Sequence, residues 1–338
     1  MTATATRRGE DLTVHVDLRR AERNIERFHA AASERRVAVR AHVKGHRTVG
    51  LAVRQIESGA CGVSVTQAGQ AREYLEAGIT DIVIAHPWRD AWRFPLFAEL
   101  ARDCVLAVHV DDPVVLGALG AAAREAGSTI GVLARIGDGY DATASSPARL
   151  LALARQARHT PGLRFDGLTS YQGMLAPADG RDGFDIGGRT ARYAVRCAGY
   201  LRARGVPCRT VSVGGTPTAA GILSVPGVTE LGSGAYALLD GGLVEAGICT
   251  GEDVALTVSL ASGGEHDRAE SLLAEHRYPW QRPGPALPAA GLPPAPVAAP
   301  HLCPLLQEVQ VLHVRGLSGR VDRWPVLNLP DTAPPGAA

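Results

Sequence analysis

The fold is decided by the stretch Asp81-Ile-Val-Ile-Ala85, the helical period Ala91–Asp103 that follows it, and the next run, Val105-Leu-Ala-Val-His109. Short apolar runs of this kind are typical of strands buried in a parallel sheet, and such strands need a crossover connection between them. A second unit follows, since the helical period Pro113–Ala126 leads to the run Ile130-Gly-Val-Leu-Ala134. The stretch therefore predicts consecutive β-α-β units.

The same alternation continues on both sides and completes a set of eight predicted strands. The other strands are predicted at Val37–Ala41, Gly62–Val65, Phe165–Leu168, Arg209–Val213 and Val228–Leu231, and the other helices at Gln67–Ala77, Pro147–His159 and Gly188–Gly205. Eight short strands that alternate with helices favour an α/β fold of the (β/α)8 TIM-barrel type. An open doubly wound sheet is the alternative.

A second, antiparallel β domain is predicted after residue 247, where strand patterns follow one another without helices between them. Its strands are predicted at Val254–Leu260, Glu308–Val314 and Arg320–Val326, and the early strand Leu12–Asp17 is expected to join them. The predicted domains are thus a barrel over 12–247 and a β domain over 248–330 with a proline-rich loop at 278–300. Residues 1–11 and 331–338 are expected to be tails.

The composition excludes several classes of protein. A net charge of +1 gives no electrostatic footprint for nucleic acid or an anionic membrane, and no apolar run is long enough to span a bilayer. The first residues lack the apolar core of a secretory signal, and the six cysteines have no paired spacing. The sequence therefore predicts a cytoplasmic protein whose partners are small molecules and other copies of itself.

Lys44 is the only lysine of the chain, and arginine supplies every other basic side chain apart from histidine. A lysine amine forms a Schiff base with a carbonyl once it loses its proton, whereas a guanidinium does not act as an amine nucleophile. Lys44 and His42 lie in the run Arg40-Ala-His-Val-Lys-Gly-His46, directly after the first predicted barrel strand. The carboxyl ends of barrel strands form the active-site face, which makes Lys44 and His42 candidate catalytic residues.

A glycine-rich turn, Gly214-Gly-Thr216, follows the seventh predicted barrel strand, and Gly232-Ser-Gly-Ala-Tyr236 follows the eighth. Glycine turns expose backbone N–H groups to an anion, and barrels frequently bind phosphate at this place. Further along the chain, His301 and Cys303 lie two residues apart in Pro300-His-Leu-Cys-Pro304. In an extended segment their side chains share one face, and imidazole with thiolate suits a zinc-like metal ion.

A reactive lysine, a phosphate turn and a metal pair together indicate pyridoxal 5'-phosphate, whose ring acts as an electron sink. Arg40-Ala-His-Val-Lys-Gly-His-Arg47 resembles the Arg-Pro-His-x-Lys-Thr-His-Lys signature of the D-threonine aldolase and D-serine dehydratase family. These are fold-type III pyridoxal phosphate enzymes with an alanine racemase-like N-terminal domain. The resemblance continues through four further segments and ends with two near the C-terminus. The four are Ala77–Ile84, Gly167–Gly173, Ser212–Thr218 and Glu230–Tyr236, and the two are Pro300–Pro304 and Gly319–Val326.

The resemblance implies a role for each matched residue. Lys44 would carry the cofactor, and Tyr171 would lie near its ring. Gly214, Gly215 and Thr216 would hold the phosphate, with Tyr236 nearby, and His301 and Cys303 would bind a divalent metal, zinc or manganese. The family usually has an arginine after the fifth barrel strand, and Tyr140 stands about there in this chain.

The activity that the resemblance implies is a lyase acting on a β-hydroxy-D-amino acid, by retro-aldol cleavage. The alternatives are a D-serine dehydratase-like β-elimination that gives a keto acid and ammonia, an amino acid racemase, and a pyridoxal phosphate-binding protein without catalysis. Family members commonly pair, so the resemblance also implies a homodimer.

Overall fold

The computed structural model describes residues 12–137, 145–171, 183–260, 297–298, 311–316, 320–327 and 331–333. The chain divides into two compact units. One unit comprises residues 28–44, 49–234 and 329–338, and the other comprises residues 1–27, 45–48 and 235–328.

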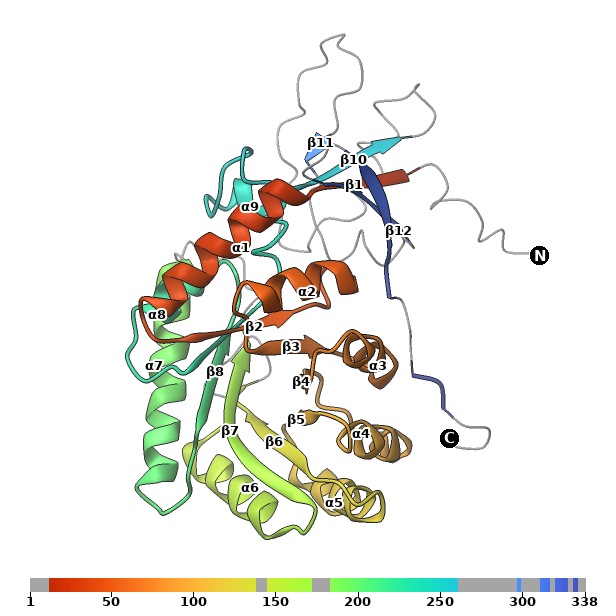
Figure 1. The fold of residues 1–338 in the computed structure, drawn as a ribbon. Coiled ribbons are helices and arrows are strands. Elements are labelled where there is room, and N and C mark those ends of the chain that lie inside the picture. The colour runs from red at the N-terminus through yellow and green to blue at the C-terminus, as the bar shows by residue number, and fades with distance from the viewer. Residues whose placement is uncertain are drawn as a thin grey trace, which may run out of the picture. The chain divides into compact units, whose positions relative to one another are not determined.

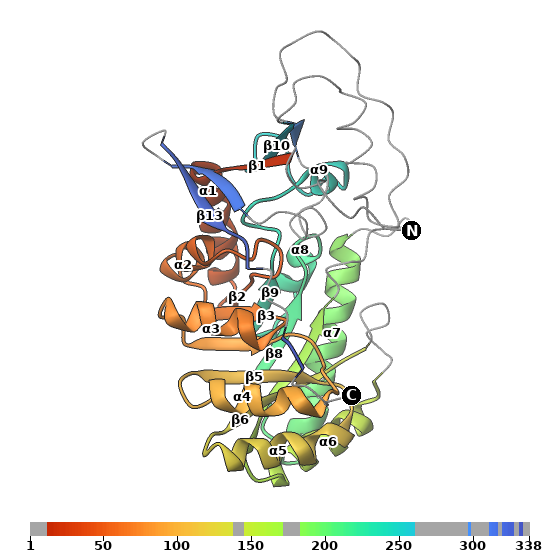
Figure 2. The same cartoon turned by 90° about the vertical axis from the view of Figure 1, so that its right-hand side faces the viewer.

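The first unit contains a closed barrel of eight parallel strands, which confirms the predicted TIM-type fold (Figures 1 and 2). Each strand pairs in parallel with the next one along the chain, and the last closes on the first, so the barrel has no open edge. The strands are β2 (Ala38–His42), β3 (Gly62–Val65), β4 (Asp81–Ile84), β5 (Val105–Val110), β6 (Ile130–Arg135), β7 (Leu163–Tyr171), β8 (Thr210–Gly214) and β9 (Glu230–Ser233).

Helices connect these strands and lie outside the barrel in both views (Figures 1 and 2). They are α2 (Val49–Glu57), α3 (Ala68–Glu76), α4 (Phe94–Leu100), α5 (Leu116–Glu125), α6 (Pro147–His159), α7 (Gly183–Arg202) and α8 (Ala219–Leu223), with short 3-10 turns η1 (Ala91–Arg93) and η2 (Pro113–Val115). Helix α6 shows why they form. The Ser146 side chain accepts a hydrogen bond from the Arg149 N–H at its start, and Leu150, Leu153 and Ala154 recur at helical spacing on the buried face.

A register shift between β6 and β7 sets the position of the site-bearing end of β7. The shift lies between Val132 and Leu133, and Gly167 has a φ of +157° beside it. A Cβ at Gly167 would overlap the carbonyl oxygen of Thr210 on β8. Glycine is therefore required at this bulge, after which Thr169 and Tyr171 continue toward the carboxyl end of the strand.

The second unit contains a five-stranded sheet in the order β11-β10-β1-β12-β13. Three of its four strand pairs are antiparallel, and β1 pairs with β12 in parallel. The antiparallel β domain predicted from the sequence therefore contains one parallel pair, because the N-terminal strand enters the middle of the sheet. The strands are β1 (Leu12–Asp17), β10 (Leu256–Leu260), β11 (Val297–Ala298), β12 (Val311–Arg315) and β13 (Val321–Pro325).

Two further helices accompany these elements, α1 (Leu18–Ser33) and α9 (Gly241–Glu245). The α9 N-terminus is capped by Asp240, whose carboxylate accepts a hydrogen bond from the Leu243 N–H at 3.0 Å. No helix in the described part of the chain combines the length and the apolar character that crossing a bilayer requires.

Candidate active site

Lys44 lies two residues beyond the end of β2, at the carboxyl end of the barrel. Its side chain is half-buried, and Nζ is 4.6 Å from the centroid of the Tyr171 ring at the end of β7. The imidazole of His42 stacks on the same ring, with 5.1 Å between centroids and 21° between planes. The structure thus brings together three residues that the sequence predicted for one site.

Two glycines make this contact between β2 and β7 possible. Strands β8 and β9 separate β7 from β2 in the barrel, so the two rings meet across them. A Cβ at Gly214 on β8 would come within 2.6 Å of the Tyr171 ring, and a Cβ at Gly232 on β9 would overlap Nε2 of His42. Any larger residue at either place would push the rings apart.

The turn predicted to bind phosphate is tied to the neighbouring strand. The Gly215 N–H donates to the carbonyl oxygen of Gly232 at 3.0 Å, and Gly215 has a φ of +137° that favours glycine. The hydroxyl of Thr216 lies 3.2 Å from that of Ser233. The Gly215 N–H is therefore engaged in the barrel, and Thr216 supplies the side-chain hydroxyl of the turn.

His42 and His109 are buried histidines that stay neutral. Burial is the main cause that holds the pKa of His42 well below its usual range, and the charges of Lys44 and Arg40 add to it. Burial, followed by the charges of Arg135 and Lys44, lowers the pKa of His109 to about 3. Within the described residues Nδ1 of His42 has no hydrogen-bond partner, which is costly for a buried nitrogen unless a ligand satisfies it.

Three residues of this end were not predicted from the sequence, namely His86, His109 and Arg135. They lie after β4, within β5 and at the end of β6. The pKa of His86 is lowered by burial and then by the charges of Arg135 and Lys44. The alternation of side chains along a strand could have identified two of them. His109 lies two positions after Ala107 on β5, and Arg135 lies two positions after Leu133 on β6, so each shares a face with the earlier residue.

Arg135 lies close in sequence to the place where the family resemblance predicts an arginine, after the fifth barrel strand, β6. Tyr140 lies outside the described residues, whereas Arg135 brings a guanidinium to the carboxyl end of β6 itself. No carboxylate of the described segments forms an ion pair with Arg135. A cation is therefore present at this end of the barrel, five residues earlier than the family pattern suggests.

Arg40 belongs to the same sequence motif as Lys44 but lies in a different layer. Its guanidinium donates to Glu230 at 2.9 Å and to Asp81 at 2.7 Å, both at the first position of their strands. The Ser212 hydroxyl donates to the other oxygen of Glu230 at 2.7 Å. Arg40 therefore belongs to a closed network toward the amino end of the barrel.

The remaining predicted site residues are not placed with this group. Tyr236 is 2% exposed and belongs to the other compact unit. His301 and Cys303 lie outside the described residues, and so does any metal site that they form. In the segments that the structure does describe, no three histidine, cysteine or carboxylate side chains gather as a metal site would require.

The residues at the carboxyl end of the barrel fit a pyridoxal phosphate cofactor. Lys44 supplies an amine, which lies over the aromatic ring of Tyr171. Nδ1 of His42 is buried and has no hydrogen-bond partner among the described residues. The glycine turn at the end of β8 provides the Thr216 hydroxyl. These are the chemical groups that an aldehyde, a planar ring and a phosphate call for.

The model of the family described as alanine racemase, N-terminal domain, matches residues 16–237. D-threo-3-hydroxyaspartate dehydratase of Delftia sp. (strain HT23) is 35% identical over 248 residues, which are 72% of this chain and 65% of that protein. D-threonine aldolase of Arthrobacter sp. is 34% identical over 228 residues, 67% of this chain and 60% of that protein. The matched regions thus span less than two thirds of these relatives.

Solved structures extend the likeness over nearly the whole chain. A histidine-to-alanine mutant of D-threo-3-hydroxyaspartate dehydratase has a TM-score of 0.80 at 26% identity, covering 96% of this chain and 95% of that one. A cysteine-to-alanine mutant of a dehydratase of the same name, in a metal-free form, has a TM-score of 0.75 at 24% identity and covers 96% and 98%.

Proposed function

The chain belongs to the alanine racemase N-terminal domain family, and from this premise we propose that it is a pyridoxal phosphate-dependent lyase of β-hydroxy-D-amino acids. The observation that carries the proposal is the environment of Lys44. The single lysine of the chain lies at the active-site end of the barrel, 4.6 Å from the Tyr171 ring and next to a neutral, buried His42. The names of two relatives, an aldolase and a dehydratase, support the class of reaction.

In this proposal Lys44 would hold the cofactor covalently, and Tyr171, on which His42 stacks, would lie near its ring. Pyridoxal phosphate, when bound, withdraws electrons from the α-carbon of an amino acid that it holds. With the cofactor and a substrate bound, the Lys44 amine would be the group that holds or moves a proton at Cα of the substrate. The glycine turn after β8 would hold the phosphate, with the Thr216 hydroxyl as its side-chain donor, since the Gly215 N–H is used in the barrel.

A divalent metal, zinc or manganese, at His301 and Cys303 is part of the proposal. Their imidazole and thiolate are suitable donors, and a metal-free form of a related dehydratase implies that the enzyme of that name binds one. A metal lowers the pKa of a hydroxyl that it binds. His301 and Cys303 would therefore orient the β-hydroxyl of the substrate and promote loss of its proton.

Two reactions use this arrangement. In retro-aldol cleavage the β-hydroxyl loses its proton, the bond between Cα and Cβ breaks, and Cα takes up a proton, which gives glycine and an aldehyde. In β-elimination Cα loses a proton to Lys44 and the β-hydroxyl departs, and hydrolysis then gives a keto acid and ammonia. We place the aldol cleavage first, and the similarity to a D-threo-3-hydroxyaspartate dehydratase is the specific observation that favours elimination as the second candidate.

Borohydride reduction of the purified protein, followed by peptide mapping, tests the attachment at Lys44. We expect a visible absorbance band that the reductant abolishes and a reduced adduct on the peptide containing Lys44. A colourless protein that stays colourless after addition of pyridoxal phosphate would contradict the proposal.

Product analysis separates the two reactions. Glycine and acetaldehyde from D-threonine indicate the aldolase, and ammonia with a keto acid from D-serine or D-threo-3-hydroxyaspartate indicates the dehydratase. Racemisation that persists after chelation and in His301→Ala would identify a racemase instead. A bound cofactor whose spectrum no β-hydroxy amino acid changes would identify a protein without catalysis.

A further inference from the structure

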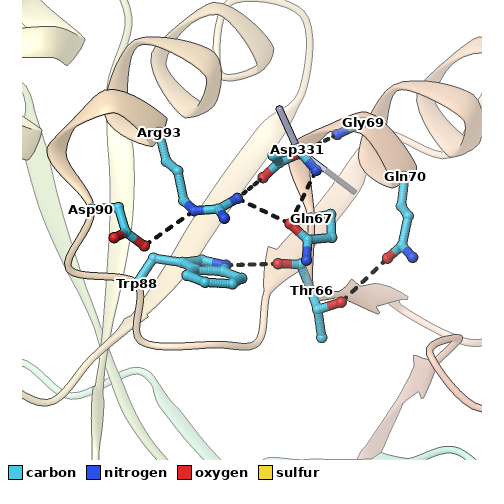
Figure 3. Close-up of polar contacts among 8 residues, drawn as sticks. All are labelled: Thr66, Gln67, Gly69, Gln70, Trp88, Asp90, Arg93 and Asp331. Atoms are coloured by element: carbon cyan, nitrogen blue, oxygen red, sulfur yellow. Dashed lines mark hydrogen bonds and ion pairs between the residues drawn. The ribbon is translucent and has the colours of Figure 1, made fainter. Parts of the chain in front are cut away.

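Asp331 joins a partly buried polar cluster formed by the segments that follow β3 and β4 (Figure 3). Its side chain is 1% exposed, and it accepts hydrogen bonds from Nη1 of Arg93 at 2.6 Å and from the Gly69 N–H at 2.9 Å. The Asp331 N–H and Arg93 also donate to Oε1 of Gln67, at 3.4 and 3.0 Å. A residue that the sequence assigned to a terminal tail therefore connects two segments at the carboxyl end of the barrel.

The paired charge of Asp331 determines where Arg93 lies. The guanidinium of Arg93 is stacked with two indole rings, 3.7 Å from the centroid of Trp88 and 4.1 Å from that of Trp92. Its second carboxylate partner, Asp90, lies at 3.3 Å and is 50% exposed. Without Asp331 the buried guanidinium would lose its close counter-ion, which is strongly unfavourable for a charge held away from water.

Trp88 connects Arg93 to His86. Its Nε1 donates to the carbonyl oxygen of Thr66 at 2.7 Å. The centroid of its ring lies 4.3 Å from the centroid of the His86 imidazole. His86 in turn lies within the electrostatic influence of Lys44 and Arg135. A continuous series of contacts thus runs from Asp331 through Arg93 and Trp88 to His86.

We propose that Asp331 is a positioning residue of the active site, which holds His86 against the bound substrate by way of Arg93 and Trp88. This inference rests on the proposed function, because Lys44 identifies the substrate site only if that function is correct. It assigns to the C-terminal segment a role in substrate binding, because a shift of the Trp88 ring would remove the contact that holds the imidazole of His86 in place.

An NMR titration of His86 in the protein without substrate tests the positioning directly. Burial and the charges of Arg135, Lys44 and Arg93 lower the pKa of His86, while Asp111 raises it. If Asp331→Asn releases Trp88, His86 moves out of this environment and its pKa rises toward 6.5. A charge effect without movement has the opposite sign, since an uncompensated Arg93 lowers the pKa of His86 further. A lower or unchanged pKa would therefore overturn the proposal.

Steady-state kinetics of the holoenzyme give a second measurement. We expect Asp331→Asn to raise KM for a β-hydroxy-D-amino acid by about 10- to 100-fold, the range expected for displacement of a positioning group, with a smaller change in kcat. Asp90→Asn is the matched control, because it removes the exposed partner of the same arginine and should leave KM near its original value. Equal KM values in both variants and the unmodified chain would contradict the inference.

Trp88→Phe keeps the proposal testable if Asp331→Asn does not fold. It retains an aromatic ring beside Arg93 and removes the hydrogen bond to Thr66, so the same rise in the pKa of His86 is expected. The borohydride experiment separates the two proposals. Absence of an adduct on Lys44 would remove the proposed function, whereas a normal adduct with an unmoved His86 would remove only the role of Asp331.

Discussion

Arg40 and His42 lie two residues apart on the same strand and show how differently the two layers of the barrel are built. Around Arg40 every charge has a counter-charge, with Glu230 at 2.9 Å and Asp81 at 2.7 Å. Around His42 the neighbouring charges are cationic, and the imidazole stays neutral with one unsatisfied nitrogen.

This difference separates stability from function. A buried ion pair that is fully hydrogen-bonded has a single arrangement and nothing left to offer a ligand. A buried polar nitrogen without a partner, close to the charge of Lys44, costs stability unless an anionic or polar ligand satisfies it. The network at the amino end therefore stabilises the barrel, whereas the carboxyl end has polar groups that can bind a ligand.

Replacing the lysine is the most severe test of the binding end. We expect Lys44→Arg to lower activity by about 10³-fold or more, because arginine retains the cation over Tyr171 but forms no covalent bond to the cofactor. The melting temperature should change by less than about 2 °C, as befits a half-buried residue whose charge is kept. Turnover assays and thermal unfolding check both expectations, and an active Lys44→Arg variant would refute the assignment.

The opposite result is expected at the amino-end layer. Arg40→Met should lower the free energy of unfolding by about 3–5 kcal/mol, since Glu230 would remain buried without its counter-ion. Urea unfolding measures the loss. Arg54→Met is the matched control: its ion pair with Glu57 is exposed, and its removal should cost about 0–1 kcal/mol. Equal losses of unfolding free energy in the two variants would contradict the distinction between the two layers of the barrel.

Gly232 tests the contact that the two rings make across the barrel. A Cβ there overlaps Nε2 of His42, so Gly232→Ala should cost about 1–3 kcal/mol through overpacking and separate the His42 and Tyr171 rings. Gly117 in α5 has open space around it, and Gly117→Ala should instead stabilise the helix by about 0.5–1 kcal/mol. Denaturant unfolding and aromatic NMR shifts of the two variants provide the comparison.

His109 makes the stability of the fold depend on pH. The pKa of this imidazole is lowered from 6.5 to about 3, so between these values the unfolded chain binds a proton that the folded barrel does not. The free energy of unfolding should therefore fall as the pH decreases below 6.5, by about 1.4 kcal/mol per pH unit for this group. His109→Gln should reduce that slope, whereas a change at the exposed His159 should leave it intact.

The barrel followed well from the sequence, because its evidence is local. The run 81–85 and its counterparts showed apolar character over strand-length segments, and the structure places a strand at each of them. Helix α2, at Val49–Glu57, was not predicted. The register shift at Gly167 was not foreseen either, because pairing between β6 and β7 is a property of two distant segments.

The sequence by itself determined the chemistry: a lone lysine, a histidine two residues before it and a glycine turn are properties of residue type and order. Tertiary structure alone decided which charges meet. Asp81 and Glu230 reach Arg40, and Asp331 reaches Arg93, across separations of 41, 190 and 238 residues. Composition and periodicity carry no information about such pairs, because tertiary folding, not chain order, brings their atoms within hydrogen-bonding distance. Assembly of the barrel strands does so around Arg40, and packing of the C-terminal segment does so at Arg93.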